Sequence, residues 1–216
     1  IILKIQLFNR FLHRKDDNIM SDLYEARNSI YCYPNSNVLK NKFNIKDNKL
    51  LEELERKITL VKLFELRQNN NIGNFDINHL ISIHKFLFED IYPFAGLFRT
   101  ENIAKDNFSF AEWQYIEEQL NNLLDKLKQE NYLANLNTKT FVKRLAYYMS
   151  ELNVLHPFRE GNGRVIREFI RQLAFKNGYL LDLQDINPKE MLAACIRSVV
   201  DTSNLENILS FCLKKI

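Results

Sequence analysis

The sequence predicts an all-α fold, a bundle of helices that carries one small β-hairpin. Only five glycines and four prolines interrupt the 216 residues, and these two residue types are the strongest breakers of helices. Apolar residues recur at helical spacing in one segment after another. Hydrophobic residues make up 46% of the chain and charged residues 26%, which supplies enough apolar material for a folded core.

Stripes of apolar residues three or four positions apart predict the individual helices. The first stripe consists of Leu50, Leu54, Ile58 and Val61. Later stripes cover residues 77–91, 113–127, 141–155, 165–173 and 191–199, and a last helix is expected over 203–214.

Capping residues support several of these helix ends. Asp76 precedes the second stripe and Asn187-Pro188 opens the sixth, as a cap and a first helical residue. Gly178 follows the fifth stripe, where glycine favours helix termination. Trp113 begins the third stripe, and we expect its side chain in the core.

One segment, residues 97–111, lacks the helical period. Phe108 and Phe110 alternate with polar neighbours, and residues 105–107 have turn-like composition. We expect a short β-hairpin here. A two-stranded hairpin is marginal alone, so it must lean on the helices.

Charge and apolar runs bear on partners and location. The net charge of +3 is too balanced to favour nucleic acid as a partner. Residues 1–13 are apolar but interrupted by Lys4 and Arg10, so we expect an amphipathic N-terminal helix rather than a signal peptide or a membrane span. We divide the chain into an N-terminal helical segment, 1–29, and a core domain, 30–216, and expect a cytoplasmic protein. Delivery into another cell stays an option.

Cysteines and histidines outside the motif described next are expected to be structural. The three cysteines fit neither a zinc site nor a redox pair. His79 and His84 lie five residues apart in one predicted helix, so they do not share a face. We expect both to be hydrogen-bonded core residues rather than ligands.

Residues 156–167, HPFREGNGRVIR, carry the chemistry. A helix should end at Leu155, because Pro157 disfavours helical geometry in the residue before it. A new helix should begin near Gly163, after a turn with two glycines. The unpaired N–H groups of this turn and the positive end of the helix dipole make an anion site. Glycine allows a phosphate to approach the backbone closely.

The other residues of the segment complete a site for a nucleotide. Arg164 and Arg167 lie three apart on one helical face, and two guanidinium groups suit a polyphosphate. Glu160 is a natural ligand for Mg²⁺, and His156 is a candidate general base. Phe158 is expected to anchor the loop in the core. An ordinary connection between two helices would explain each residue singly, but not all of them within twelve positions. The residues therefore predict in-line transfer from a magnesium–nucleoside polyphosphate to a hydroxyl.

The segment resembles the Fic motif, HPF-x-[D/E]-GN-G-R-x-x-R, at every specified position. Residues 31–42 resemble the opening of many bacterial Fic cores, and residues 94–100, FAGLFRT, resemble the family's FAGxxRT stretch. Together these resemblances cover about residues 30–215. They imply a helical core with a β-hairpin flap over the active site. They also imply a protein adenylyltransferase that moves AMP from ATP to a Tyr, Ser or Thr hydroxyl of a target protein, with self-modification as a further option.

The resemblance also implies roles for single residues. The flap would bind the target chain as an added strand, with Lys105, Asn107, Phe108 and Phe110 as its contact residues. The motif roles would be His156 as base, Glu160 for Mg²⁺, Gly161, Asn162 and Gly163 for the α-phosphate, and Arg164 and Arg167 for the β- and γ-phosphates.

Other activities of the scaffold remain alternatives. Doc-like members transfer the γ-phosphate, but they depart from the motif at its second glycine, which is Gly163 here. A kinase-type enzyme, a transferase with another nucleotide donor and a low-turnover nucleotide-binding regulator stay open.

Many Fic proteins resemble one another in an inhibitory helix with the pattern [S/T]xxxE[G/N], whose glutamate pairs with the second motif arginine, here Arg167. Ser21 and Glu25 have this spacing, although Ala26 departs from the expected Gly or Asn. Residues 202–207 match every letter, but they open the last predicted helix, where such a pattern is a capping signal. We prefer Ser21 and Glu25 as the inhibitory pair.

Overall fold

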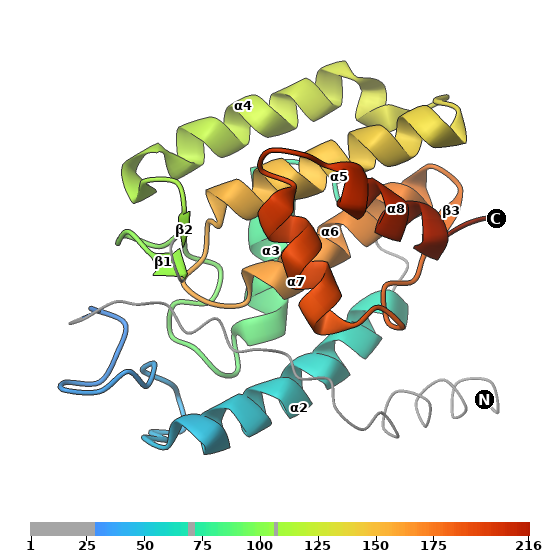
Figure 1. Cartoon of the computed structure of the whole chain (residues 1–216). Coiled ribbons are helices and arrows are strands. Elements are labelled where there is room, and N and C mark those ends of the chain that lie inside the picture. The colour runs from blue at the N-terminus through green and yellow to red at the C-terminus, as the bar shows by residue number, and fades with distance from the viewer. Residues whose placement is uncertain (1–28, 69–71, 106–107) are drawn as a thin grey trace, which may run out of the picture.

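The computed structural model describes residues 29–68, 72–105 and 108–216, and it confirms the predicted all-α fold with a β-hairpin (Figure 1). The α-helices are α2 (Asn48–Gln68), α3 (Ile77–Phe88), α4 (Ile116–Gln129), α5 (Thr138–Leu155), α6 (Asn162–Lys176), α7 (Pro188–Arg197) and α8 (Ser203–Cys212). The 3-10 helices η1 (Trp113–Tyr115) and η2 (Asn131–Leu133) flank α4.

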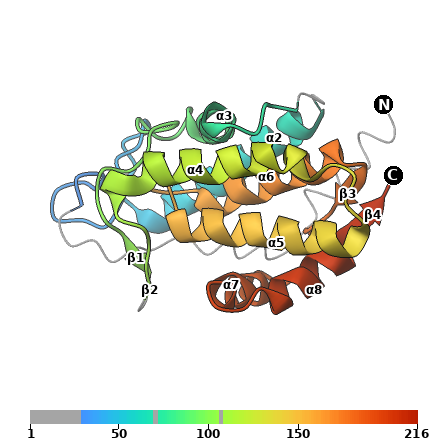
Figure 2. The same ribbon diagram turned by 90° about the horizontal axis from the view of Figure 1, so that it is seen from above.

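Helices α5 and α6 lie at the centre of the bundle. Helices α4 and α8 pack on α5, α3 packs on α6, and α2 packs on α3 (Figures 1 and 2). Both central helices bury apolar side chains completely, among them Leu145 and Leu152 of α5 and Phe169 and Leu173 of α6. The loop between these two helices is the predicted motif, so the most buried part of the fold positions it.

The predicted caps of α3, α6 and α7 are confirmed. The Asp76 side chain accepts a hydrogen bond of 2.8 Å from the N–H of His79 at the start of α3. The Asn187 side chain accepts from the N–H of Lys189, with Pro188 as the first residue of α7. Gly178 follows the end of α6 with φ of 78°, the left-handed conformation in which glycine ends a helix.

The predicted stripe of α2 is wrong at both of its ends. Leu50 is 54% exposed and Val61 is 44% exposed. The residues that α2 buries are Leu51, Glu55 and Thr59. The helix turns this partly polar stripe inward because Glu55 and Thr59 bind a buried arginine of the motif.

The prediction of a core position for Trp113 is also wrong. Trp113 is 38% exposed and belongs to η1, since α4 begins only at Ile116. The backbone N–H of Trp113 donates to Asn102 Oδ1 at 3.0 Å. The side chain therefore stands before the apolar stripe of α4 rather than within it.

Two antiparallel strand pairs complete the described fold. The predicted hairpin forms from β1 (Ala104–Lys105) and β2 (Phe108–Ser109), with Lys105 opposite Phe108. Strands β3 (Tyr179–Leu181) and β4 (Leu213–Lys215) were not predicted. They end α8 at Cys212, two residues earlier than expected. Within the described residues, we find no helix with the length and apolar character that crossing a bilayer requires.

Candidate active site

The motif loop begins where α5 ends. Helix α5 stops at Leu155, as predicted, and His156 follows in the left-handed region with φ of 45°. Helix α6 begins at Asn162, one residue before the predicted start. The six residues between the helices therefore make a tight, nearly buried turn.

The side chain of Asn162 closes this turn. Its Oδ1 accepts from the Phe158 N–H at 2.8 Å, and its Nδ2 donates to the Phe158 carbonyl at 2.7 Å. Both residues are fully buried, so Phe158 anchors the loop as predicted. Sequence reasoning assigned Asn162 to the nucleotide and missed this role. Its backbone N–H remains available for an anion.

His84 supports the loop from below. Its ring stacks on Phe158 with centroids 3.9 Å apart. Its Nδ1 accepts from the Gly96 N–H at 2.8 Å, so its Nε2 carries the proton and donates to the Glu160 carbonyl at 3.1 Å. Burial lowers the pKa of His84 to about 3, which keeps the ring neutral.

His79 is a second buried histidine, and its ring is hydrogen-bonded to Gln172 at 3.0 Å. Burial lowers the pKa of His79 as well. The prediction that His79 and His84 are satisfied core residues is therefore confirmed.

His156 has a fixed tautomer. Its Nδ1 lies 3.0 Å from the carbonyl oxygen of Asn153, and a carbonyl can only accept, so Nδ1 carries the proton. In the neutral ring the lone pair is then on Nε2, as a general base requires. The ring stacks on Phe110, which follows β2, with centroids 3.9 Å apart.

The N-terminus of α6 has the features of an anion site. Gly161 adopts φ of 80°, and a Cβ there would lie 2.2 Å from the ring of Phe88. A Cβ on Gly163 would lie 3.1 Å from Arg167 Nη1, so that guanidinium lies beside the first helical turn. The Gly161 N–H donates to Glu160 Oε1 at 2.8 Å. The next two N–H groups belong to the first turn, where a helix provides no acceptor. They combine with the helix dipole and with Arg167 to favour a phosphate.

Arg164 lies in different surroundings from Arg167. Its side chain is 5% exposed and forms an ion pair with Glu55 of α2. It also donates to Thr59 Oγ1 at 3.1 Å, and its Nη2 is 3.4 Å from Glu160 Oε1. Burial alone would lower the pKa of Arg164, but the charges of Glu55 and Glu160 outweigh it and raise the pKa. These contacts of Arg164 are with protein side chains, and the binding of a polyphosphate by both arginines stays a prediction.

Glu55 is the residue of this cluster that sequence reasoning missed. Besides binding Arg164, its carboxylate accepts from the Tyr92 hydroxyl. Burial, followed by the charge of Glu55, raises the pKa of Tyr92 well above its usual value. The spacing of Glu55 is the signal that could have found it. Glu55 lies four residues from both Leu51 and Thr59, so its carboxylate is on the same helical face as Leu51. When that face is buried, the carboxylate needs a cation as partner.

Glu160 is the candidate metal ligand among the described residues of the site. Among the described residues, no group of three or more His, Cys, Asp and Glu side chains could hold an ion by itself. Mg²⁺ usually takes one or two carboxylates together with phosphate oxygens. Glu160, whose carboxylate lies beside the first turn of α6, fits that arrangement.

The flap and inhibitory residues are only partly described. Lys105 and Phe108 pair across the hairpin, and Phe110 contacts His156. Asn107, Ser21 and Glu25 lie outside the described residues. The rival inhibitory candidate Glu206 accepts a hydrogen bond of 2.7 Å from the Thr202 hydroxyl at the start of α8. The Thr202 side chain makes no capping hydrogen bond to the helix backbone, so the predicted capping role of this pattern is wrong.

Comparisons with known proteins agree with this geometry. Residues 74–174 match the model of the Fic/DOC family. The chain is 42% identical over 186 residues to the protein adenylyltransferase VbhT of Bartonella schoenbuchensis, which covers 86% of the chain but only 39% of VbhT. It is 36% identical over 167 residues to the probable protein adenylyltransferase Fic of Escherichia coli K12, which covers 77% of the chain and 82% of that protein.

Solved structures give the same result. The BepC protein of Bartonella tribocorum with bound AMPPNP superimposes with a TM-score of 0.82 at 27% identity, over 86% of this chain and 97% of BepC. The N-terminal Fic domain of a VirB-translocated effector of Bartonella quintana with bound ADP gives a TM-score of 0.80 at 28% identity, over 86% and 94% of the two chains.

Proposed function

The chain belongs to the Fic/DOC family and is a nucleotidyltransferase of the protein adenylyltransferase type, and from this premise we propose that it transfers AMP from Mg–ATP to a Tyr, Ser or Thr hydroxyl of a target protein. We include its own hydroxyl groups among the acceptors. One observation carries the proposal: a histidine with its basic nitrogen defined stands at one end of a short loop whose other end is an anion site.

The proposed reaction is a single in-line displacement. Nε2 of His156 takes the proton of the target hydroxyl, and the hydroxyl oxygen attacks the α-phosphorus of ATP. The new oxygen–phosphorus bond forms as the bond to the bridging oxygen of pyrophosphate breaks, and pyrophosphate leaves. The first-turn N–H groups of α6 stabilise the charge that develops on the α-phosphate. Arg167 binds the outer phosphates.

Glu160 is the proposed ligand for magnesium. When bound, Mg²⁺ neutralises phosphate charge and fixes the conformation of the triphosphate. Arg164 and the Gly161 N–H hold the Glu160 carboxylate in place beside the first turn of α6. Arg164 thereby contributes to the site by orienting Glu160.

The hairpin is the proposed docking site for the target. A segment of the target would add to its edge as a strand, so backbone hydrogen bonds bring a hydroxyl toward the loop. Lys105, Asn107, Phe108 and Phe110 remain the proposed contact residues. The stacking of Phe110 on His156 supports a hairpin close to the base. The balanced net charge favours a protein over nucleic acid or a membrane as partner.

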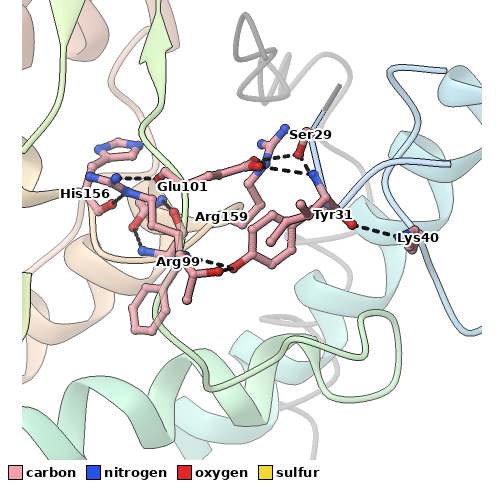
Figure 3. Close-up of polar contacts among 11 residues, drawn as sticks. Ser29, Tyr31, Lys40, Arg99, Glu101, His156 and Arg159 are labelled. Carbon is pink, nitrogen blue, oxygen red and sulfur yellow. Dashed lines mark hydrogen bonds and ion pairs between the residues drawn. The ribbon is translucent and has the colours of Figure 1, made fainter. Parts of the chain in front are cut away.

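Autoinhibition by Ser21 and Glu25 is a further part of the proposal. Glu101 accepts hydrogen bonds from the Ser29 hydroxyl at 2.5 Å and from the Ile30 N–H at 3.2 Å. The same carboxylate binds Arg159 of the motif at 2.9 Å (Figure 3). The chain is therefore tethered to the motif at residue 29. Glu25 is four residues before this tether, at most about 14 Å along an extended chain, so the proposal requires Arg167 to lie within that reach of Ser29.

We propose that the protein acts in the cytoplasm, either of the producing bacterium or of a cell into which it is delivered. Several similar structures are of VirB-translocated effector proteins of Bartonella, which keeps delivery as an option.

The test is a labelling experiment with Mg²⁺ and ATP that carries its label at the α- or the γ-phosphate. Wild type, His156→Ala and Glu25→Gly are compared with cell lysate as a source of targets, and Glu206→Gly is the matched control for the rival brake. We expect retained α-label that depends on His156 and increases in Glu25→Gly only. Retained γ-label would identify a kinase. ATP binding without any label would identify a regulator.

A further inference from the structure

Arg99 is a buried arginine that joins the base of the hairpin to the catalytic loop. Its side chain is 1% exposed, among the largest fully buried side chains of the described fold. Nε donates to the His156 carbonyl at 2.8 Å, and Nη2 donates to the Leu155 carbonyl at 3.2 Å. The Arg99 N–H also donates to the Pro157 carbonyl at 2.9 Å. One residue thus holds three consecutive carbonyls, from the last residue of α5 to Pro157. Arg99 and His156 are labelled in Figure 3.

The same guanidinium also binds both legs of the hairpin. Nη1 donates to the Glu101 carbonyl at 2.8 Å, and Nη2 donates to the Ala111 carbonyl. Glu101 precedes β1 and Ala111 follows β2. The Ala111 N–H in turn donates to the Val154 carbonyl of α5 at 3.1 Å. The hairpin base and the end of α5 therefore form one hydrogen-bonded unit.

Helix geometry explains why a cation stands at this point. The last carbonyls of a helix have no intrahelical donor and carry the negative end of the helix dipole. Arg99 satisfies one of them, the carbonyl of Leu155. It also holds the carbonyl of His156, whose left-handed φ of 45° is costly for a residue other than glycine. Such a conformation persists only when its surroundings fix it, and Arg99 is part of those surroundings.

The hairpin gains its position from the same contacts. Two-residue strands are marginal in isolation, so the hairpin depends on how its legs are held. Glu101 is fixed twice, by Arg99 at its carbonyl and by Arg159 at its carboxylate. Phe110, next to Ala111, places its ring on the His156 imidazole. A shift of either leg of the hairpin would therefore move the imidazole of His156, the proposed general base.

We propose that Arg99 is a positioning residue that fixes the hairpin and the His156 imidazole in one geometry, so that a hydroxyl docked on the hairpin meets Nε2. This inference rests on the proposed function, because it assigns to the hairpin the docking of the target. It predicts that loss of Arg99 impairs transfer after the nucleotide has bound.

The first experiment separates transfer from nucleotide binding in Arg99→Met and Arg99→Lys. The matched control is Arg144→Lys. Arg144 lies on α5, the helix whose end Arg99 binds, and its Nε binds Glu130 at 2.8 Å, but it stands eleven residues before Leu155, about 16 Å along α5. We expect kcat for target labelling to fall about 100-fold in Arg99→Met, the scale of a misplacement near 1 Å. The loss should be smaller in Arg99→Lys, and the Kd for ATP should stay within about twofold in both. Arg144→Lys should retain kcat.

A second experiment needs no transfer activity, so it tests Arg99 even if the enzyme has another chemistry. Nitrogen-15 spectra of His156 report its tautomer, and hydrogen exchange of the Phe110 and Ala111 amides reports the hairpin base. In folded Arg99→Lys and Arg99→Met we expect a loss of the single Nδ1–H tautomer and at least about tenfold faster exchange. Unchanged spectra and exchange, or a kcat equal to that of Arg144→Lys, would overturn the proposal.

Discussion

Replacing Glu55 by alanine would remove the anion that pairs with Arg164 in the buried cluster of α2 and α6. The side chains of Glu55 and Arg164 are 9% and 5% exposed, so bulk water cannot solvate a charge that has lost its partner. Arg164 would keep Thr59 at 3.1 Å and Glu160 at 3.4 Å. The hydroxyl of Tyr92 would lose the acceptor that Glu55 supplies.

These contacts set the size of the effect. Removing one partner of a buried ion pair typically costs about 3–5 kcal/mol, because the other charge stays buried without compensation. The remaining contact with Glu160 favours the lower end for the ion pair, and the orphaned Tyr92 hydroxyl adds at least about 1 kcal/mol. We therefore expect a loss of about 4 kcal/mol in the free energy of unfolding. For a chain of this size that corresponds to a fall in Tm of roughly 8–16 °C.

Thermal and urea unfolding at pH 7 would measure the change, with Glu53→Ala as control. Glu53 lies on the same helix, but its ion pair with Lys57 is solvent-exposed, so its loss should leave Tm nearly unchanged. Glu55→Gln should fall between the two, since an amide oxygen can still accept from Arg164. The reasoning fails if Glu55→Ala unfolds at the same temperature as Glu53→Ala.

Three further predictions concern the motif loop and its support. Gly161→Ala should destabilise the fold by at least about 2 kcal/mol, from backbone strain and the clash with Phe88; a Tm equal to wild type would contradict it. Asn162→Ala should cost about 2–4 kcal/mol, because the N–H and carbonyl of Phe158 lose their partners, and an unchanged urea midpoint would be inconsistent with it. The pKa of His84 is lowered from 6.5 to about 3, so below pH 6.5 the unfolded chain binds a proton that the folded chain does not. The free energy of unfolding should therefore decrease as the pH is lowered from 6.5 to about 3, by about 1.4 kcal/mol per pH unit. The pH dependence of the urea midpoint should lose this contribution in His84→Gln.

The motif loop could be predicted from the sequence because its information is local. Pro157 ends one helix, and Gly161 allows both the left-handed turn and the close approach to Phe88. Helix caps such as Asp76 act within three residues, so their signals survive in the sequence alone. The hairpin was predicted for the same reason, from alternation and turn composition within fifteen residues.

Contacts between distant residues could not be predicted in the same way. Glu55 and Arg164 are 109 positions apart, and a glutamate on a helix is usually solvated. Arg99 acts through backbone carbonyls, which have no identity in the sequence. Strands β3 and β4 are three residues each and exist because two segments more than thirty residues apart meet.

The double duty of the motif loop has a consequence for reading such motifs in other chains. Phe158, Asn162, Gly161 and Arg164 hold the loop and its neighbours together, whether or not a nucleotide ever binds. Loss of catalysis would therefore release selection on His156, while the need to fold would still preserve these four residues. A divergent relative without activity could keep most of the motif because the fold requires it. The residue at position 156, more than the match to the motif as a whole, distinguishes an active transferase from an inactive one.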